Sequence, residues 1–95
     1  MASKIDGTVV AVNAEGDLIT DIGASQLEGV PRDESVSVQC QGHETCGIYE
    51  ANHSQPDATF VACVGNSGNL ELAIVGTSIS AMLGIGVGAP VVVEW

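Results

Sequence analysis

Three cysteines and two histidines are the residues of this chain most suited to metal or nucleophilic chemistry. Cys40, His43 and Cys46 follow one another at intervals of three, and His53 and Cys63 come later. Thiolate and imidazole are the ligands that zinc prefers, so a structural zinc site is one interpretation. We favour another, because the chain lacks a C-x2-C pair and an odd number of cysteines fits reduced thiols, with Cys40 in the core. A third alternative is Cys46 as a nucleophile with His43 as its base.

Paired carboxylates are the second candidate for chemistry, because two of them can act as general acid and base. Asp17 and Asp21 are four residues apart and share one face if both lie on a strand, and Asp33 and Glu34 are adjacent. Turn formation at Asp17 and a solvated strand face at Asp21 explain the first pair more simply. Ser67 lies in neither a phosphate-binding loop nor a nucleophile elbow. The residues alone therefore assemble no catalytic machinery.

Short β-branched segments separated by Gly-rich turns must position these side chains. We expect strands at residues 5–13, 18–22, 35–40, 43–49, 59–64, 70–74 and 91–93, with loops at 23–34 and 50–57. Val36, Val38 and Cys40 alternate with polar residues, as is typical of a strand with one solvated face. About seven short strands predict an all-β fold, a small antiparallel barrel or sandwich, and we take the barrel as the prediction for a single domain of residues 1–95.

The last third of the chain contains the one expected helical turn. Ser78 is suited to cap a turn that begins at Ile79, and Gly84 is suited to end it in a left-handed conformation. Residues 72–93 carry no charge, which raises the question of a transmembrane helix. Glycines, a proline and hydroxyl residues interrupt this run, so we assign it to a half-buried sheet and expect no membrane partner.

Composition narrows the classes of partner. Two basic residues stand against twelve acidic ones, for a formal charge of −10, so we expect neither nucleic acid nor an anionic membrane surface as a partner. The acidity indicates solubility, and the lack of a leader-like start predicts a cytoplasmic protein. Only three aromatic residues are present, so the core must consist of aliphatic side chains. The apolar run 72–93 predicts a homo-oligomer, because one small barrel cannot cover it alone.

Four segments together resemble a known family. Gly7-Thr-Val-Val, then Glu15-Gly-Asp-Leu-Ile-Thr-Asp-Ile22, then Asn66-Ser-Gly-Asn-Leu-Glu-Leu-Ala73, then Met82-Leu-Gly-Ile-Gly-Val-Gly88 and a closing valine strand occur in order. They resemble the C-terminal β-barrel domain of the S-adenosylmethionine hydroxide adenosyltransferase and fluorinase/chlorinase family. The likeness extends over almost the whole chain.

This resemblance implies a site shared between chains. In the family an N-terminal domain holds the ribose and methionine parts of the ligand, and the C-terminal barrel of a neighbouring subunit in a trimer supplies the adenine pocket. The adenine-facing positions here would be Glu15, Asp17, Asp21, Ser67, and the backbone around Val75 and Gly76. No cofactor is implied beyond an S-adenosylmethionine or adenosine ligand. A trimer is the favoured assembly.

Two substitutions set this chain apart from the family pattern. Glu15 replaces the aromatic residue that would stack on adenine, and Asp17 replaces an asparagine. An ionised aspartate accepts hydrogen bonds from the exocyclic amine but cannot donate to a ring nitrogen. We therefore expect a stand-alone, non-catalytic module for binding or oligomerisation with weakened adenosyl affinity. The alternatives are a subunit that completes a split active site with a separately encoded catalytic-domain partner, and a zinc-stabilised domain.

Overall fold

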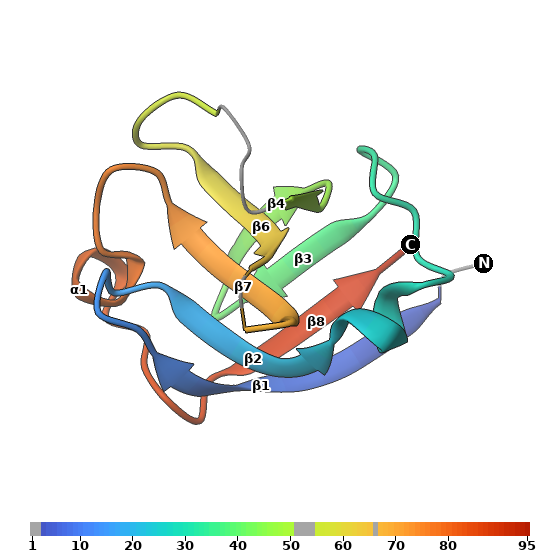
Figure 1. Ribbon diagram of the computed structural model, residues 1–95, viewed down its shortest axis with the longest axis horizontal. Coiled ribbons are helices and arrows are strands. Elements are labelled where there is room, and N and C mark those ends of the chain that lie inside the picture. Colours follow the sequence, from blue (N-terminus) through green and yellow to red (C-terminus); the bar gives the residue numbers. More distant parts are fainter. Residues whose placement is uncertain (1–2, 51–54, 66) are drawn as a thin grey trace.

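The computed structural model describes residues 3–50, 55–65 and 67–95, and this part of the chain is mostly strand. Eight strands are present in it: β1 (Lys4–Val12), β2 (Leu18–Gly23), β3 (Ser37–Cys40), β4 (His43–Cys46), β5 (Tyr49–Glu50), β6 (Phe60–Val64), β7 (Asn69–Ile74) and β8 (Pro90–Glu94). A 3-10 helix, η1 (Ala24–Leu27), follows β2, and one α-helix, α1 (Ile79–Leu83), lies between β7 and β8 (Figure 1). Within the described residues no helix is long and apolar enough to cross a membrane.

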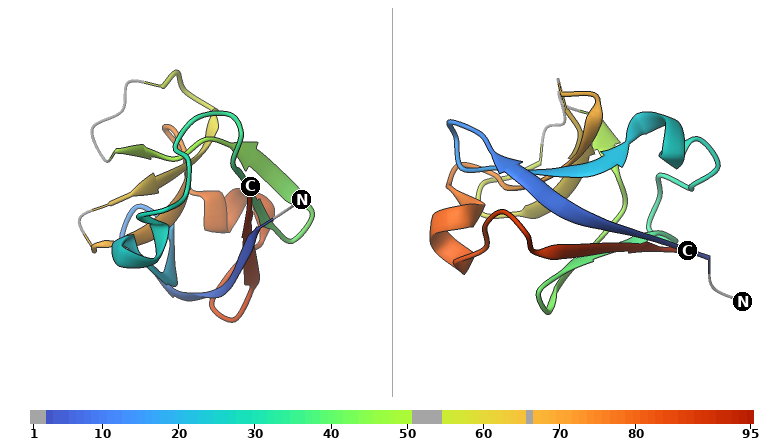
Figure 2. Two further views of the ribbon diagram at one scale, coloured as in Figure 1. Left: turned by 90° about the vertical axis from the view of Figure 1, so that its right-hand side faces the viewer. Right: turned by 90° about the horizontal axis from the view of Figure 1, so that it is seen from below.

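All eight strands belong to one curled sheet. Their order is β4-β3-β8-β1-β2-β7-β6-β5, so the first and last strands of the chain are paired near the middle. The sheet curls into a half-barrel, and β4 at one edge approaches β6 near the other (Figures 1 and 2). The Thr45 hydroxyl of β4 donates to the Phe60 carbonyl oxygen of β6 at 2.8 Å across this gap. The predicted all-β class is confirmed.

The structure differs from the predicted barrel around residues 43–50. A single strand was expected over residues 43–49, but Gly47, with φ +87°, divides it into β4 and β5. The short β5 pairs with β6 in parallel, whereas every other neighbouring pair is antiparallel. Glu50, expected in a loop, ends β5, and residues 51–54, including the candidate ligand His53, lie outside the described residues.

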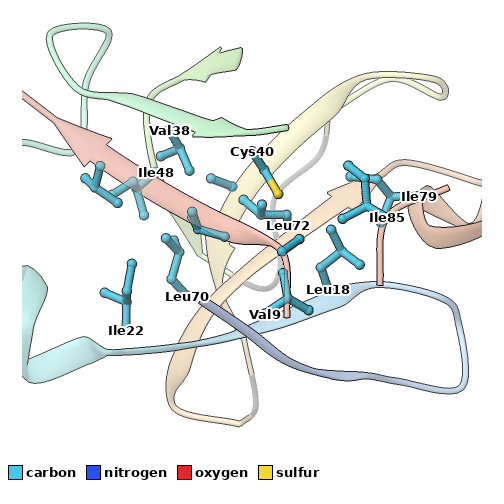
Figure 3. Packing of buried hydrophobic residues seen from close by; sticks show 14 of the residues in the cluster. Val9, Leu18, Ile22, Val38, Cys40, Ile48, Leu70, Leu72, Ile79 and Ile85 are labelled. Atoms are coloured by element: carbon cyan, nitrogen blue, oxygen red, sulfur yellow. The ribbon is translucent and has the colours of Figure 1, made fainter. Parts of the chain in front are cut away.

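The core fills the concave side of the sheet. Leu70, Leu72 and Ile74 of β7 are buried in it, as the period-two pattern predicts. Val36, Val38 and Cys40 are buried in the same cluster, which confirms the predicted alternation of the segment that includes β3. Figure 3 shows that aliphatic side chains from several strands meet here with Ile79 of α1 and Ile85. Burial of each such side chain stabilises the fold by about 1.5–3 kcal/mol relative to exposure.

The predicted helical turn forms with the expected ends. The Ser78 hydroxyl accepts a hydrogen bond from the Ala81 amide at 3.1 Å, so Ser78 caps α1. Gly84 ends the helix in the left-handed conformation, with φ 67°. Pro90 then begins β8. The uncharged run 72–93 is thus divided among the end of β7, α1 and β8.

Candidate functional site

The tip of the β1–β2 hairpin forms one wall of the candidate site, and Asn13 fixes its shape. The Asn13 side-chain oxygen accepts from the backbone amides of Glu15 at 3.0 Å and Asp17 at 2.9 Å. The Asn13 carbonyl oxygen also accepts from the Gly16 amide at 3.0 Å. An asparagine that bonds to the backbone beyond it is a common means of closing a turn. The chain is therefore reversed so that Glu15 and Asp17 flank Gly16 at the end of the sheet.

The connection from β7 to α1 forms the opposite wall. Val75 is held on both sides, because its amide donates to the Thr59 carbonyl at 3.0 Å and its carbonyl accepts from the Ala58 amide at 2.8 Å. The Thr77 amide donates to the Ile74 carbonyl at 3.1 Å and turns the chain toward Ser78. This wall is thus fixed by backbone hydrogen bonds to the segment before β6.

Contacts at Gly16 and α1 join the two walls. The Ser80 amide, in the first turn of α1, donates to the Gly16 carbonyl oxygen at 3.1 Å. Gly16 also packs against Ser78 so closely that an added Cβ would overlap the serine side chain. The hairpin tip and α1 therefore lie together at one end of the molecule, as the views of Figures 1 and 2 show. Gly16 is the point at which the hairpin wall contacts the start of α1.

A pocket of about 460 Å³ opens between these walls. Its lining residues are Glu15, Asp17, Ala73, Ile74, Val75, Gly76, Thr77 and Ser78. Four of them, Glu15, Asp17, Val75 and Gly76, are adenine-facing positions implied by the resemblance. A volume of this size is typical of sites for drug-sized ligands. The pocket offers carboxylate, hydroxyl and backbone groups over an aliphatic floor, and none of its lining residues is basic or aromatic.

Sequence reasoning missed half of this lining. Thr77 and Ser78 bring hydroxyl groups to the pocket, yet the sequence marked Ser78 only as a helix cap. Ala73 and Ile74 supply apolar surface. Their position directly beside Val75 and Gly76 is the one signal that could have pointed to them, because neighbours of a backbone binding segment commonly share its site.

Two of the predicted positions lie outside the pocket. Asp21 is exposed on β2, and its carboxylate accepts from the Thr8 amide at 2.9 Å. Ser67 lies in the β6–β7 turn, where its hydroxyl donates to Glu71 at 2.7 Å and accepts from the Asn69 amide at 3.2 Å. Asp17 precedes β2 rather than lying on it, so it does not share a strand face with Asp21, which was the less favoured of the two interpretations. Both Asp21 and Ser67 serve the backbone around them in this structure.

The cysteines and histidine proposed for zinc do not gather. Cys40 of β3 is buried and lies opposite exposed His43, whereas Cys46 is exposed opposite Ser37. Odd-numbered spacing on a strand sends side chains to opposite faces, so His43 and Cys46 of β4 do not form the proposed base and nucleophile pair. Cys63 lies on β6 opposite Glu71. Within the described residues no three potential metal ligands lie together.

Cys63 is held in the thiol form. Burial raises its pKa to about 11, and the negative charges of Glu71 and Asp17 add to the shift. Burial also raises the pKa of the Cys40 thiol. Because the thiolate is the reactive species, neither buried cysteine is suited to act as a nucleophile at neutral pH.

A second pocket of about 480 Å³ lies elsewhere on the surface. It is lined by Arg32, Asp33, Glu34, Ser35, Gly47 and Tyr49. The Asp33 carboxylate accepts from the amide and the hydroxyl of Ser35, and these hydrogen bonds lower its pKa. The adjacent pair of Asp33 and Glu34 therefore belongs to a folded loop. None of the predicted ligand-facing residues reaches this pocket.

Comparisons with known proteins agree with this fold. The profile of the SAM hydroxide adenosyltransferase C-terminal domain matches residues 7–92. A solved structure of an uncharacterised conserved protein from Thermotoga maritima superposes with a TM-score of 0.76 at 20% identity, over 95% of this chain and 35% of that chain. A conserved hypothetical protein from Thermus thermophilus gives a TM-score of 0.70 at 26% identity, over 90% of this chain and 33% of that chain. No curated protein sequence matches significantly.

The match defines a module within longer proteins. This chain spans about a third of the length of the two solved structures. The profile match extends from β1 to β8 and includes both walls of the pocket. The chain belongs to the SAM hydroxide adenosyltransferase C-terminal domain family.

Proposed function

We propose that this chain is a non-catalytic binding and oligomerisation module, whose pocket between the hairpin tip and the β7–α1 connection keeps weak affinity for an adenosyl ligand. One observation carries the proposal. Glu15, Asp17, Val75 and Gly76, which the family resemblance implies as adenine-facing, line one pocket although they come from two separate segments. The family match supports the interpretation of this pocket as a site for an adenosyl ligand.

Weak affinity follows from the chemistry of the lining residues. Glu15 offers no ring on which a base can stack, and Asp17 offers only acceptors. Loss of one stacked base and one hydrogen bond removes about 2–4 kcal/mol of recognition. What remains is the aliphatic surface of Ala73 and Val75 and the hydroxyl and backbone groups from Gly76 to Ser78.

Restoring the two missing groups tests this function. The double substitution Glu15→Tyr with Asp17→Asn is expected to strengthen adenosine binding by up to about 2–4 kcal/mol, because it returns a stacking face and a donor. Isothermal titration calorimetry of both proteins with adenosine measures the gain. Asp21→Asn is the matched control, since it neutralises a carboxylate outside the pocket. Equal or weaker binding by the double variant would sink the proposal.

We also propose self-association, with a trimer favoured by the family resemblance. The large apolar side chains exposed in the described residues are Val10, Val12, Met82 and Val87. Val10 and Val12 lie on β1, and the Gly88 amide beside Val87 donates to the Val9 carbonyl at 2.8 Å, so three of the four lie near one another. No charged residue occurs in segments 7–14 and 72–93, which contain all four. Copies that each carry −10 can approach at such a surface with least repulsion.

Sedimentation velocity tests the assembly. The unaltered chain is expected to sediment as an oligomer, and Val10→Thr with Val87→Ser is expected to shift it toward the monomer, because both changes remove exposed apolar area. Neither side chain is buried in the monomer, so the fold should keep its melting temperature. A clean monomer of the unaltered chain at high concentration would contradict self-association.

A split active site is the second candidate function. This chain spans about a third of the length of the two solved structures, and its pocket opens to the surface, so a separate catalytic-domain partner could cover it. In that case adenosine binding by this chain alone would be weaker than binding by the mixture with its partner. Equal affinity in the two preparations would favour the independent binding module.

A further inference from the structure

The pocket of Glu15 and Asp17 is rich in acceptors and poor in cationic donors. Two carboxylates line it together with the hydroxyl groups of Thr77 and Ser78. The Ser78 hydroxyl already accepts from the Ala81 amide, and no lysine, arginine or histidine lines the pocket. The chain has only two basic residues, and Arg32 lines the other pocket while the Lys4 Nζ lies 3.7 Å from Asp6 Oδ1. A ligand that pairs with these carboxylates must therefore bring its own N–H donors.

Asp17 sets the strictest requirement on that ligand. Asp17 is half-buried, and its Oδ2 accepts a long hydrogen bond, at 3.4 Å, from the side-chain nitrogen Nδ2 of Asn13. A ligand that covers Asp17 removes further water from an ionised group, and the charge must then be compensated by donors. A carboxylate has two oxygens and takes two parallel N–H groups best.

Adenine and guanine differ in this respect. The pairing edge of adenine presents one amine donor beside a ring nitrogen acceptor, and that acceptor would face a carboxylate oxygen. The pairing edge of guanine presents a ring N–H and an amine as adjacent donors, which match both oxygens of one carboxylate. A site built to accept hydrogen bonds discriminates strongly against an analogue that lacks the donor.

The negative charge of the pocket is a second factor that selects among ligands. A phosphate group would enter a pocket that has two carboxylates and belongs to a chain of net charge −10. Charges inside one pocket lie closer together than the screening length of physiological salt, so the repulsion between phosphate and carboxylate is only partly screened. The pocket therefore disfavours nucleotides relative to nucleosides. Its volume of about 460 Å³ suits a base with its sugar better than a guanidinium group alone.

We propose that this pocket selects a ligand without negative charge whose planar edge presents two adjacent N–H donors to Asp17, a guanine nucleoside in preference to an adenine nucleoside or any nucleotide. This inference rests on the proposed function, because it takes the pocket as a nucleoside site and changes the base that it prefers. The same donor pair occurs in a guanidinium group. The experiment must therefore distinguish a guanine nucleoside from a guanidinium ligand.

NMR amide-shift titrations with guanosine, adenosine, guanosine monophosphate and agmatine test the proposal. Guanosine is expected to bind about tenfold more tightly than adenosine or its own monophosphate, with shifts at Glu15, Asp17 and Gly76. Asp17→Asn should reverse the order of the two nucleosides, since an amide both donates and accepts. Asp21→Asn, outside the pocket, should leave the order unchanged.

The possible results separate this inference from the proposed function. Adenosine binding as tightly as guanosine would overturn the guanine preference and leave nucleoside binding intact. Absence of shifts with either nucleoside at millimolar concentration would overturn both proposals. Shifts with agmatine and none with guanosine would overturn the proposal of a nucleoside ligand and would indicate a guanidinium ligand instead.

Discussion

Replacement of Gly16 by alanine is expected to lower the free energy of unfolding by about 2–5 kcal/mol. Gly16 has φ +83°, a conformation that costs an L-residue about 1–2 kcal/mol. An added Cβ would also overlap Ser78, lying 2.5 Å from the serine Cβ, and overpacking of this kind costs about 1–3 kcal/mol. The melting temperature should fall by roughly 10–40 °C, measured by circular dichroism or calorimetry.

Alanine substitutions at two other glycines distinguish the cost of the backbone conformation at Gly16 from the cost of its contact with Ser78. Gly42 has φ +84° with open space around its Cβ position, so Gly42→Ala should cost only the backbone component of about 1–2 kcal/mol. Gly86 has open space and lies outside the left-handed region, so Gly86→Ala should be nearly neutral. If Gly16→Ala costs no more than Gly42→Ala, the contact with Ser78 does not hold the hairpin against α1.

The double variant Gly16→Ala with Ser78→Gly links the fold to the site. Removal of the serine side chain relieves most of the overlap and costs only a few tenths of a kcal/mol at the helix cap, because glycine is tolerated there. Stability should therefore recover in part. The pocket should also widen, because Gly16 and Ser78 come from its opposite walls.

The parts of the fold that depend on local pattern could be predicted from the sequence. Leu70, Leu72 and Ile74 repeat with period two, and this spacing alone places them on the buried face of β7. Ser78 and Gly84 bracket α1 because a cap and a left-handed end need particular residue types. Such signals lie within a few residues of the structure that they specify.

The parts that depend on distant pairing could not be predicted. Tyr49 joins β6 in parallel through Cys63, and nothing within the 43–50 segment marks that orientation. Val61 and Cys63 are buried but lie outside the main core cluster, so burial on this strand does not follow one face. The same limit applies to the site. Thr77 faces Glu15 and Asp17 across one pocket because the hairpin at Gly16 docks on α1.

In the pairing of β2 with β7, a single side chain helps to fix the register of two strands that are distant in sequence. The register is Leu18 with Leu72 and Gly23 with Asn69, with a shift between them that interrupts the ladder of hydrogen bonds. Thr20 lies in this interval and is fully buried. Its hydroxyl donates to the Leu70 carbonyl at 2.7 Å and accepts from the Ile22 amide at 3.2 Å. The side chain thus replaces hydrogen bonds that the backbone lacks at the shift.

Thr20→Val is therefore expected to lower the free energy of unfolding by about 2–6 kcal/mol, although valine has nearly the same shape. The Leu70 carbonyl and the Ile22 amide would lose their hydroxyl partner in a buried place, at about 1–3 kcal/mol each. Chemical denaturation measures the loss.

Thr45→Val is the matched control, because the Thr45 hydroxyl donates to one carbonyl only and the residue is half-buried, where water can replace it. It should cost about 0.5–1.5 kcal/mol. Equal costs for the two variants would mean that Thr20 does not hold the shifted register. A larger cost at Thr20 would explain how β2 and β7 stay aligned so that Asp17 and Ala73, which flank this pairing, both line the pocket.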